Sequence, residues 1–296
     1  MSDAARLGLV RSRWSIALGV LAGLWMGACD RPDGMWRDQF VFIADDGTVI
    51  PVGVVRWSSG RAEAKAWFGE GGQWGSSFFH RFEISGPAGP DVDRAMALLS
   101  AHEGTPARVS LARRDRGIEL RLRTRSELFV LDARDLSELG EPVDPEGASV
   151  YRAGRATWTG RGRSLDGWLV VEETPRERPR RPFVEFGDFV FLVLADPERG
   201  TIVVKRSLGL AAFDHALVGG AGPTRRTDRV ELSRGESSLD LSLPELDLRS
   251  QLSIRDRQVT HGQGPDGSDV DYETLLLGGD RAGVAFTIHP ARETSP

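Results

Sequence analysis

The chain has 296 residues, of which 40% are hydrophobic, 27% charged and 8% aromatic, a composition typical of a globular protein. Its 38 basic and 43 acidic residues give a formal net charge of -5, which excludes a general basic surface for nucleic acid. The single cysteine excludes a disulfide framework and a zinc site made of four thiolates.

The first predicted element is a secretory signal over residues 1–28. Arginines at positions 6, 11 and 13 precede an uncharged run, residues 14–28, that is too short to span a bilayer as a stable helix. The run leads into the segment WMGAC, residues 25–29, which resembles the lipobox of bacterial lipoproteins. The resemblance implies that acyl chains on Cys29 anchor the mature protein in the bacterial cell envelope, facing the periplasm or the exterior. The alternative is an ordinary signal peptide with a chance cysteine.

Beyond the signal, apolar and polar residues alternate, which predicts half-buried antiparallel strands. One such run contains Ile118, Leu120 and Leu122, and another contains Leu239 and Leu241. Glycine-rich turns separate these runs at short intervals. Many short strands with such turns indicate an all-β fold of barrels or sandwiches.

Two short helices are predicted within this all-β pattern. Residues 91–103 follow Pro90, carry apolar residues at helical spacing from Val92 to Leu99, and are followed by Gly104 as a stop. A second helical turn is predicted near residues 134–139.

The chain is predicted to form two domains. Residues 172–182, EETPRERPRRP, contain three prolines and seven charged residues, which disfavours a central strand. We therefore expect an N-terminal β-domain over residues 29–171, a linker over residues 172–182 and a C-terminal β-domain over residues 183–296. Similar strand–turn–strand patterns open both halves, at residues 40–50 and 189–203, and either duplication or chance explains them.

One passage resembles a known family. Residues 151–160, YRAGRATWTG, and residues 165–172, LDGWLVVE, are similar to a passage in the lipocalin-like twin-barrel proteins related to carotenoid 1,2-hydratases (hydroxyneurosporene synthases). The resemblance implies two lipocalin-like domains and an activity that adds water to an isolated double bond. After the aromatic strand the chain has EETP where the family usually has an Asp-x-Glu-Trp ending.

The search for catalytic motifs is negative: the chain has no nucleophile elbow, His-Glu-x-x-His helix, phosphate loop or Rossmann fingerprint. The five histidines show no metal-ligand spacing, so neither a metal nor a cofactor is expected. Alternation places His80 on one face with Phe78 and Phe82, and it places His215 among apolar residues. Each is either a neutral core histidine or a polar contact in a ligand cavity. For a hydratase, the candidate catalytic residues are Asp214, His215 and His80.

The aromatic residues supply candidate contacts for an apolar ligand. All six tryptophans outside the signal lie in the first half of the chain. They suit either a hydrophobic core or a barrel that binds an apolar molecule. Trp67 shares a strand face with Lys65, so it is expected to face outward or to line a polar lumen. The candidate ligand-binding residues are Trp57, Trp67, Trp158, Trp168, Phe78 and Phe82.

An acidic segment, residues 262–273, places Asp269, Asp271 and Glu273 on one strand face. Carboxylates are ligands for calcium, but the segment lacks the spacing of an EF-hand loop. We expect a solvated acidic turn.

Three functional hypotheses follow. The first is a lipid-anchored envelope protein that binds an apolar small molecule or an envelope partner without catalysis. The second is a hydratase-type lyase similar to the carotenoid hydratases. The third is a scaffold lipoprotein that recruits a protein partner through an exposed sheet edge. None of them involves nucleic acid.

Overall fold

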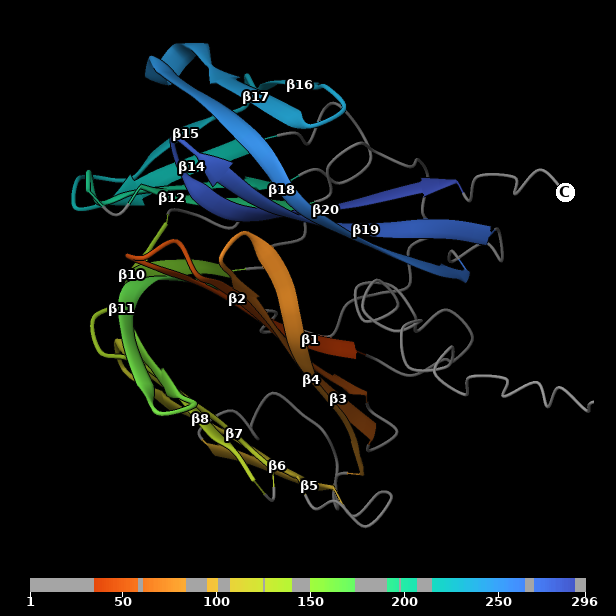
Figure 1. The fold of residues 1–296 in the computed structure, drawn as a ribbon. Helices are drawn as coiled ribbons and strands as arrows, with labels where there is room; N and C mark the ends of the chain where they lie inside the picture. The colour runs from red at the N-terminus through yellow and green to blue at the C-terminus, as the bar shows by residue number, and fades with distance from the viewer. Residues whose placement is uncertain are drawn as a thin grey trace, which may run out of the picture.

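The computed structural model describes residues 35–57, 61–83, 95–100, 107–124, 126–139, 150–173, 191–196, 198–206, 215–263 and 269–290. Within these residues the chain forms two curled antiparallel sheets, which lie face to face (Figure 1). This confirms the predicted all-β fold. The predicted signal and Cys29 lie outside the described residues.

The N-terminal sheet has the strand order β4-β3-β2-β1-β11-β10-β8-β7-β6-β5, with β9 paired to β10. Its strands are β1 (Met35–Ala44), β2 (Val49–Trp57), β3 (Arg61–Glu70), β4 (Gln73–Glu83), β5 (Ala95–Ser100), β6 (Ala107–Arg114), β7 (Gly117–Arg123), β8 (Leu128–Ala133), β9 (Ser137–Glu138), β10 (Val150–Gly160) and β11 (Arg163–Glu173).

The C-terminal sheet has the strand order β15-β14-β13-β12-β20-β19-β18-β17-β16. Its strands are β12 (Phe191–Asp196), β13 (Thr201–Arg206), β14 (His215–Gly220), β15 (Arg225–Thr227), β16 (Glu231–Arg234), β17 (Ser238–Leu243), β18 (Leu248–Gln263), β19 (Asp269–Gly279) and β20 (Ala282–Pro290), and a 3-10 turn, η4 (Pro244–Leu246), joins β17 to β18.

The two sheets share one topology. In each, the first strand pairs with the second strand on one side and with the last strand on the other: β1 with β2 and β11, and β12 with β13 and β20. The two predicted opening hairpins are therefore confirmed, and they occupy equivalent places in the two sheets.

The central strands are apolar on both faces because both faces are buried. On β1, Phe40 and Phe42 point into the core of the N-terminal sheet, whereas Val41 and Ile43 pack toward the C-terminal sheet. On β12, Leu192 faces its own sheet's core. Continuous apolar runs are typical of strands covered on both sides.

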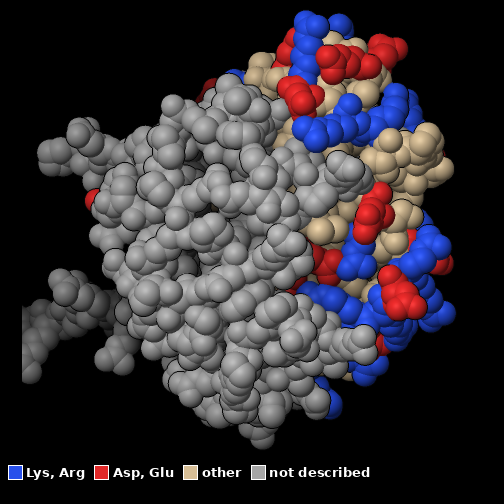
Figure 2. All heavy atoms as spheres, turned by 180° about the vertical axis from the view of Figure 1, so that it is seen from behind, with Lys and Arg blue, Asp and Glu red and all other residues tan. Residues whose placement is uncertain are grey.

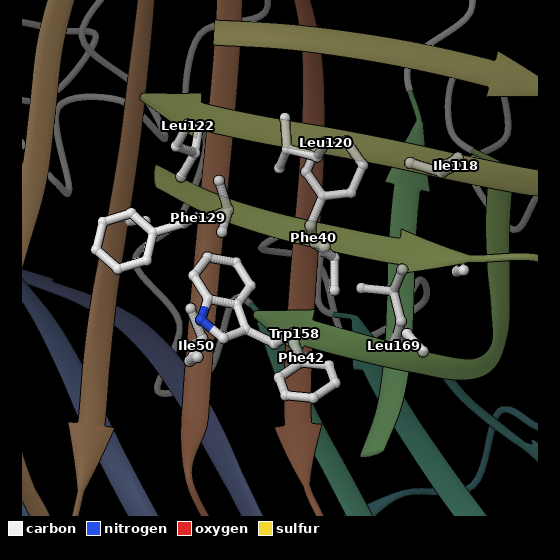
Figure 3. Packing of buried hydrophobic residues seen from close by; sticks show 14 of the residues in the cluster. Phe40, Phe42, Ile50, Ile118, Leu120, Leu122, Phe129, Trp158 and Leu169 are labelled. Atoms are coloured by element: carbon white, nitrogen blue, oxygen red, sulfur yellow. The ribbon is translucent and has the colours of Figure 1, made fainter. Parts of the chain in front are cut away.

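The concave side of the N-terminal sheet is filled by its own side chains (Figure 3). Trp158 lies at its centre, with ring centroids 5.6 Å from Phe129, 5.7 Å from Phe68 and 6.4 Å from Phe42. Arg161 covers the rim, with its guanidinium 4.6 Å from the Phe68 ring centroid. Such interlocking aromatic contacts form a packed core.

The predicted helix over residues 91–103 is wrong in the part that the structure describes, since Ala95–Ser100 form strand β5. Residues 96–99 are apolar throughout, so helical spacing and strand alternation both fit them. Pairing decides the outcome: Met96 and Leu98 are register partners of Leu111 and Val109 on β6.

The second predicted helical turn, near residues 134–139, is also wrong. Short strand β9 lies there, and the backbone N–H groups of Leu136 and Leu139 donate to the carbonyl oxygens of Arg116 and Tyr151. These bonds to the turn between β6 and β7 and to β10 replace the hydrogen bonds within a helical turn.

Strand β11 continues through Glu173, past residue 172, where the sequence predicts the linker to begin. Both Glu172 and Glu173 are buried. Buried carboxylates are retained in strands when they are paired, and Glu173 has two arginine partners. The domain division itself stays a prediction.

Figure 2 shows acidic and basic side chains interspersed over the described part of the face opposite to the view in Figure 1. Several of the charged side chains of the chain form exposed ion pairs, including Arg155 with Asp45 at 2.6 Å and Arg163 with Asp46 at 3.2 Å. Such exposed pairs contribute little to stability.

Candidate functional site

The two sheets meet along a layer of buried apolar and aromatic side chains, which we call the seam. The N-terminal sheet contributes Val41, Ile43, Trp67, Tyr151, Trp168 and Val170, and the C-terminal sheet contributes Phe191, Val193, Leu217, Leu276, Val284 and Phe286. The seam is also bridged by a hydrogen bond of 2.6 Å from the Trp74 backbone N–H to Asp256 Oδ2.

Strand register places a row of polar residues along one end of the seam. Going across β3, β2, β1, β11 and β10, the row consists of Lys65, Gly53, Gln39, Glu172 and Tyr151, each the register partner of the next. Lys65 and Gln39 are 3% exposed and Glu172 is 1% exposed. We call these five residues the polar row. Alternation places it on the face that also carries Val41 and Trp67.

A register row of the C-terminal sheet packs against the polar row of the N-terminal sheet. His215, Phe191, Phe286 and Thr274 belong to one register row across β14, β13, β12, β20 and β19. Tyr151 of the polar row stacks on Phe191 with 6.4 Å between ring centroids, and Phe191 stacks on Phe286 at 6.3 Å. His215 is 2% exposed and interacts with neighbouring groups.

Within the polar row, the side-chain amide of Gln39 lacks hydrogen-bond partners. Both side-chain amide atoms are buried, and neither Nε2 nor Oε1 has a hydrogen-bond partner. Leaving such groups unpaired away from water costs about 1–3 kcal/mol. Next to Gln39, a methyl group built on Gly53 would meet no atom within 4 Å. An unsatisfied amide therefore lies beside a partly exposed glycine that leaves open space on the seam face.

Two tryptophans add unsatisfied donors at the seam. The indole N–H groups of Trp74 and Trp168 are buried without hydrogen-bond partners. Trp74 lies 6.2 Å from Trp67 between ring centroids. Buried indole N–H groups usually have an acceptor, so the seam combines aromatic side chains with a few unsatisfied polar groups, a composition typical of ligand sites.

The concave side of the N-terminal sheet ends in a buried ionic cluster rather than in the seam. Asp38, Arg113, Glu173 and Arg152 come from β1, β6, β11 and β10. Arg113 contacts Asp38 at 2.8 Å and Glu173 at 2.7 Å, and Arg152 Nε donates to Glu173 at 2.8 Å. Burial lowers the pKa of Arg113, but the two carboxylates outweigh it and raise that pKa above its ordinary value. The cluster joins strands across the curled sheet.

The C-terminal sheet has an ionic cluster around Glu273. Arg234 contacts this carboxylate at 2.8 Å, Arg257 at 2.9 Å and Thr287 Oγ1 at 3.1 Å. Burial raises the pKa of Glu273, but the bonds from His289 and Arg234 and the charges of both arginines outweigh it and lower the pKa to about 2. Among the predicted acidic residues, Glu273 is thus a buried, paired group and not part of a solvated turn.

Of the predicted catalytic residues, the structure places only His215 in the seam. Asp214 lies outside the described residues. His80 is on β4 as the register partner of Ala64, which belongs to the N-terminal core, and its side chain is outside the described part. The catalytic role of His80, His215 and Asp214 therefore stays a prediction.

The predicted aromatic contacts divide between core and seam. Trp67 and Trp168 lie in the seam, and Trp67 is buried rather than turned outward, although its strand face carries Lys65. Trp158 belongs to the packed N-terminal core. The side chains of Trp57, Phe78 and Phe82 are outside the described part.

Sequence reasoning missed Gln39, Gly53 and Glu172. A signal for Gln39 exists, since it is an uncharged polar residue at the start of the apolar run FVFIA. The charged and proline-rich residues that follow Glu172 predict a linker beginning at this residue. Its position opposite Gln39 depends on strand register, which the local sequence does not show.

Two features are absent from the described residues. None of their histidine, cysteine, aspartate and glutamate side chains form a group of three that could hold a metal ion. No helix among them has the length and hydropathy needed to cross a membrane.

The two curled sheets and the seam between them define an all-β protein with two half-barrel-like sheets packed face to face. No protein-family model and no curated protein matches the sequence. Among solved structures, the chain is similar to a candidate AttH protein from Nitrosomonas europaea, with 11% identity, a TM-score of 0.46 and coverage of 86% of this chain and 92% of that one. It is also similar to kievitone hydratase from Nectria haematococca, with 10% identity, a TM-score of 0.40 and coverage of 93% of each chain. Similarities at this level carry no information about activity.

Proposed function

We propose that this protein is a lipid-anchored cell-envelope protein that binds an apolar small molecule in the seam between its two sheets, without catalysis. The observation that carries the proposal is the buried, unpartnered amide of Gln39 beside the open space over the half-buried Gly53. Ligand sites are mostly apolar with a few placed polar groups, and the seam has this character. The lipobox-like segment at residues 25–29 supports the anchor.

A second candidate function is hydration of an isolated double bond. The observation that favours it is that Glu172 and His215, from facing sheets, are both nearly completely buried at the seam. Protonation of an alkene needs an acid held in an apolar site.

The test is to express the chain in a bacterial envelope, purify it in mild detergent and analyse both an organic extract and the N-terminal peptide by mass spectrometry. We expect a stoichiometric apolar molecule in the extract and an acylated Cys29 peptide, and a Cys29→Ser variant should lack the acylation but keep the ligand.

The other outcomes discriminate between the hypotheses. A bound molecule with an isolated double bond, turned over by the protein and no longer turned over by His215→Gln, would favour the hydratase. An empty extract with an acylated Cys29 peptide would contradict ligand binding and favour a scaffold lipoprotein.

A further inference from the structure

The Gln39 side chain presents a hydrogen-bond donor and an acceptor in one plane, and both are unsatisfied. The residue is 3% exposed, and its Nε2 and Oε1 atoms have no partner. An amide can pair with a second amide-like group through two parallel hydrogen bonds, one to each atom. A group that only accepts hydrogen bonds would leave Oε1 unsatisfied. The missing partner is therefore one that donates and accepts side by side.

The space for such a partner lies over Gly53. In the register of β2 and β1, Gly53 is directly opposite Gln39, and on its other side it is opposite Lys65. Its neighbours Val52 and Val54 belong to the N-terminal core, so Gly53 is on the seam face. Glycine within a strand often marks a close approach of a ligand to the backbone. Gly53 is half-buried, and among the described residues no atom lies within 4 Å of a Cβ built on it.

The charges of the polar row indicate that the partner is neutral. Lys65 and Glu172 lie on either side of Gly53 and Gln39, and their formal charges are opposite. An additional charge brought into this buried row would lack a counter-charge within it, and burying an unpaired charge is costly.

We propose that the seam over Gly53 binds the neutral head of an apolar molecule that bears a carboxamide, a lactam or an undissociated carboxylic acid, paired with the Gln39 amide. This inference rests on the proposed function, because it names the polar group of the ligand that the seam binds. The aromatic residues of the seam then contact the apolar body of the ligand.

The test uses the purified full chain, stripped of bound lipid, with three probes that share one alkyl chain: decanamide, decanoic acid and methyl decanoate. Binding is measured by native mass spectrometry titration. We expect decanamide to bind about 10- to 100-fold more tightly than the ester, which can accept but not donate. Decanoic acid should bind like the amide at low pH and lose affinity as the pH rises through its own ionisation. The pH dependence thus separates an acid ligand from an amide ligand.

Gln39→Leu should remove the preference, so that amide and ester bind with equal, low affinity. Gln251→Leu, a change of the same kind at an exposed residue of β18, should keep the wild-type preference. Because Gln39→Leu removes two unsatisfied polar atoms, it should not lower the thermal unfolding temperature, and Gln39→Met provides a second apolar variant of similar length.

An ester that binds wild-type protein as tightly as the amide would overturn the inference, and so would an amide preference that persists in Gln39→Leu. Either result leaves the proposed function standing if the native extract contains an apolar molecule. If the extract is empty and no probe binds, both the inference and the proposed function fail.

Discussion

Replacing Arg113 with methionine is expected to lower the free energy of unfolding by about 3–5 kcal/mol, because removal of one partner of a buried ion pair leaves the other charge uncompensated. The Asp38 side chain is completely buried, and Arg113 contacts it at 2.8 Å and Glu173 at 2.7 Å. These contacts span the curled N-terminal sheet from β6 to β1 and β11. Urea unfolding of wild type and variant, followed by far-UV circular dichroism, measures the change.

Arg114 provides the matched control for this change. It follows Arg113 on β6, its side chain is 54% exposed, and its contacts to Glu119 and Asp132 are 3.6 and 3.8 Å long. Arg114→Met should change the free energy of unfolding by less than about 1 kcal/mol. Adding Asp38→Asn to Arg113→Met should restore part of the loss, since Asp38 then carries no buried charge and Glu173 keeps Arg152 as its partner. Equal losses in Arg113→Met and Arg114→Met would show that the buried cluster does not stabilise the sheet.

The free energy of unfolding is expected to fall at acidic pH because Glu273 becomes protonated. The pKa of this carboxyl is lowered from its ordinary value of 4.5 to about 2 in the folded protein. A lowered folded pKa contributes stability above pH 4.5 that is lost as the pH falls toward 2. The shift corresponds to about 3 kcal/mol when complete, of which about 2 kcal/mol should be lost by pH 3.

The difference in unfolding free energy between wild type and Glu273→Gln should therefore narrow by about 2 kcal/mol when urea titrations at pH 6 and pH 3 are compared. Glu231, on β16 of the same sheet, is the control: its side chain is 57% exposed and lies 3.7 Å from Arg229. Glu231→Gln should show a nearly constant, small difference at both pH values. A difference for Glu273→Gln that does not change with pH would contradict the account of this cluster.

The sequence was sufficient to predict the class of fold because alternation is a local signal. Ile118, Leu120 and Leu122 are all buried in β7, as their spacing predicts. Local spacing failed at Met96 and its neighbours, where a run of apolar residues fits helix and strand equally and pairing with β6 determines the outcome. It also failed at Glu173, because ion pairs with Arg113 and Arg152 allow this charged residue to remain in a buried strand.

The candidate site was predicted only in part, for a similar reason. His215 was identified by its apolar surroundings, and Trp67 and Trp168 by residue type. The polar row depends on which strands are neighbours: Lys65, Gln39 and Glu172 meet because β3, β1 and β11 belong to one sheet. The C-terminal sheet then buries the seam face of the N-terminal sheet. No local sequence pattern indicates that Trp67 and Lys65 lie on this buried face.

The central claim is that a ligand binds in the open space over the half-buried Gly53. The most direct measurement compares the organic extracts of wild type and Gly53→Val, purified side by side from the same envelope. Valine suits a strand, and its Cβ meets no atom of the described residues within 4 Å, so thermal unfolding of the ligand-free variant should occur at or above the wild-type temperature. We predict that the variant folds, reaches the envelope and carries no apolar molecule, whereas wild type carries one in stoichiometric amount. A folded Gly53→Val protein with the same bound molecule in the same amount would contradict the claim.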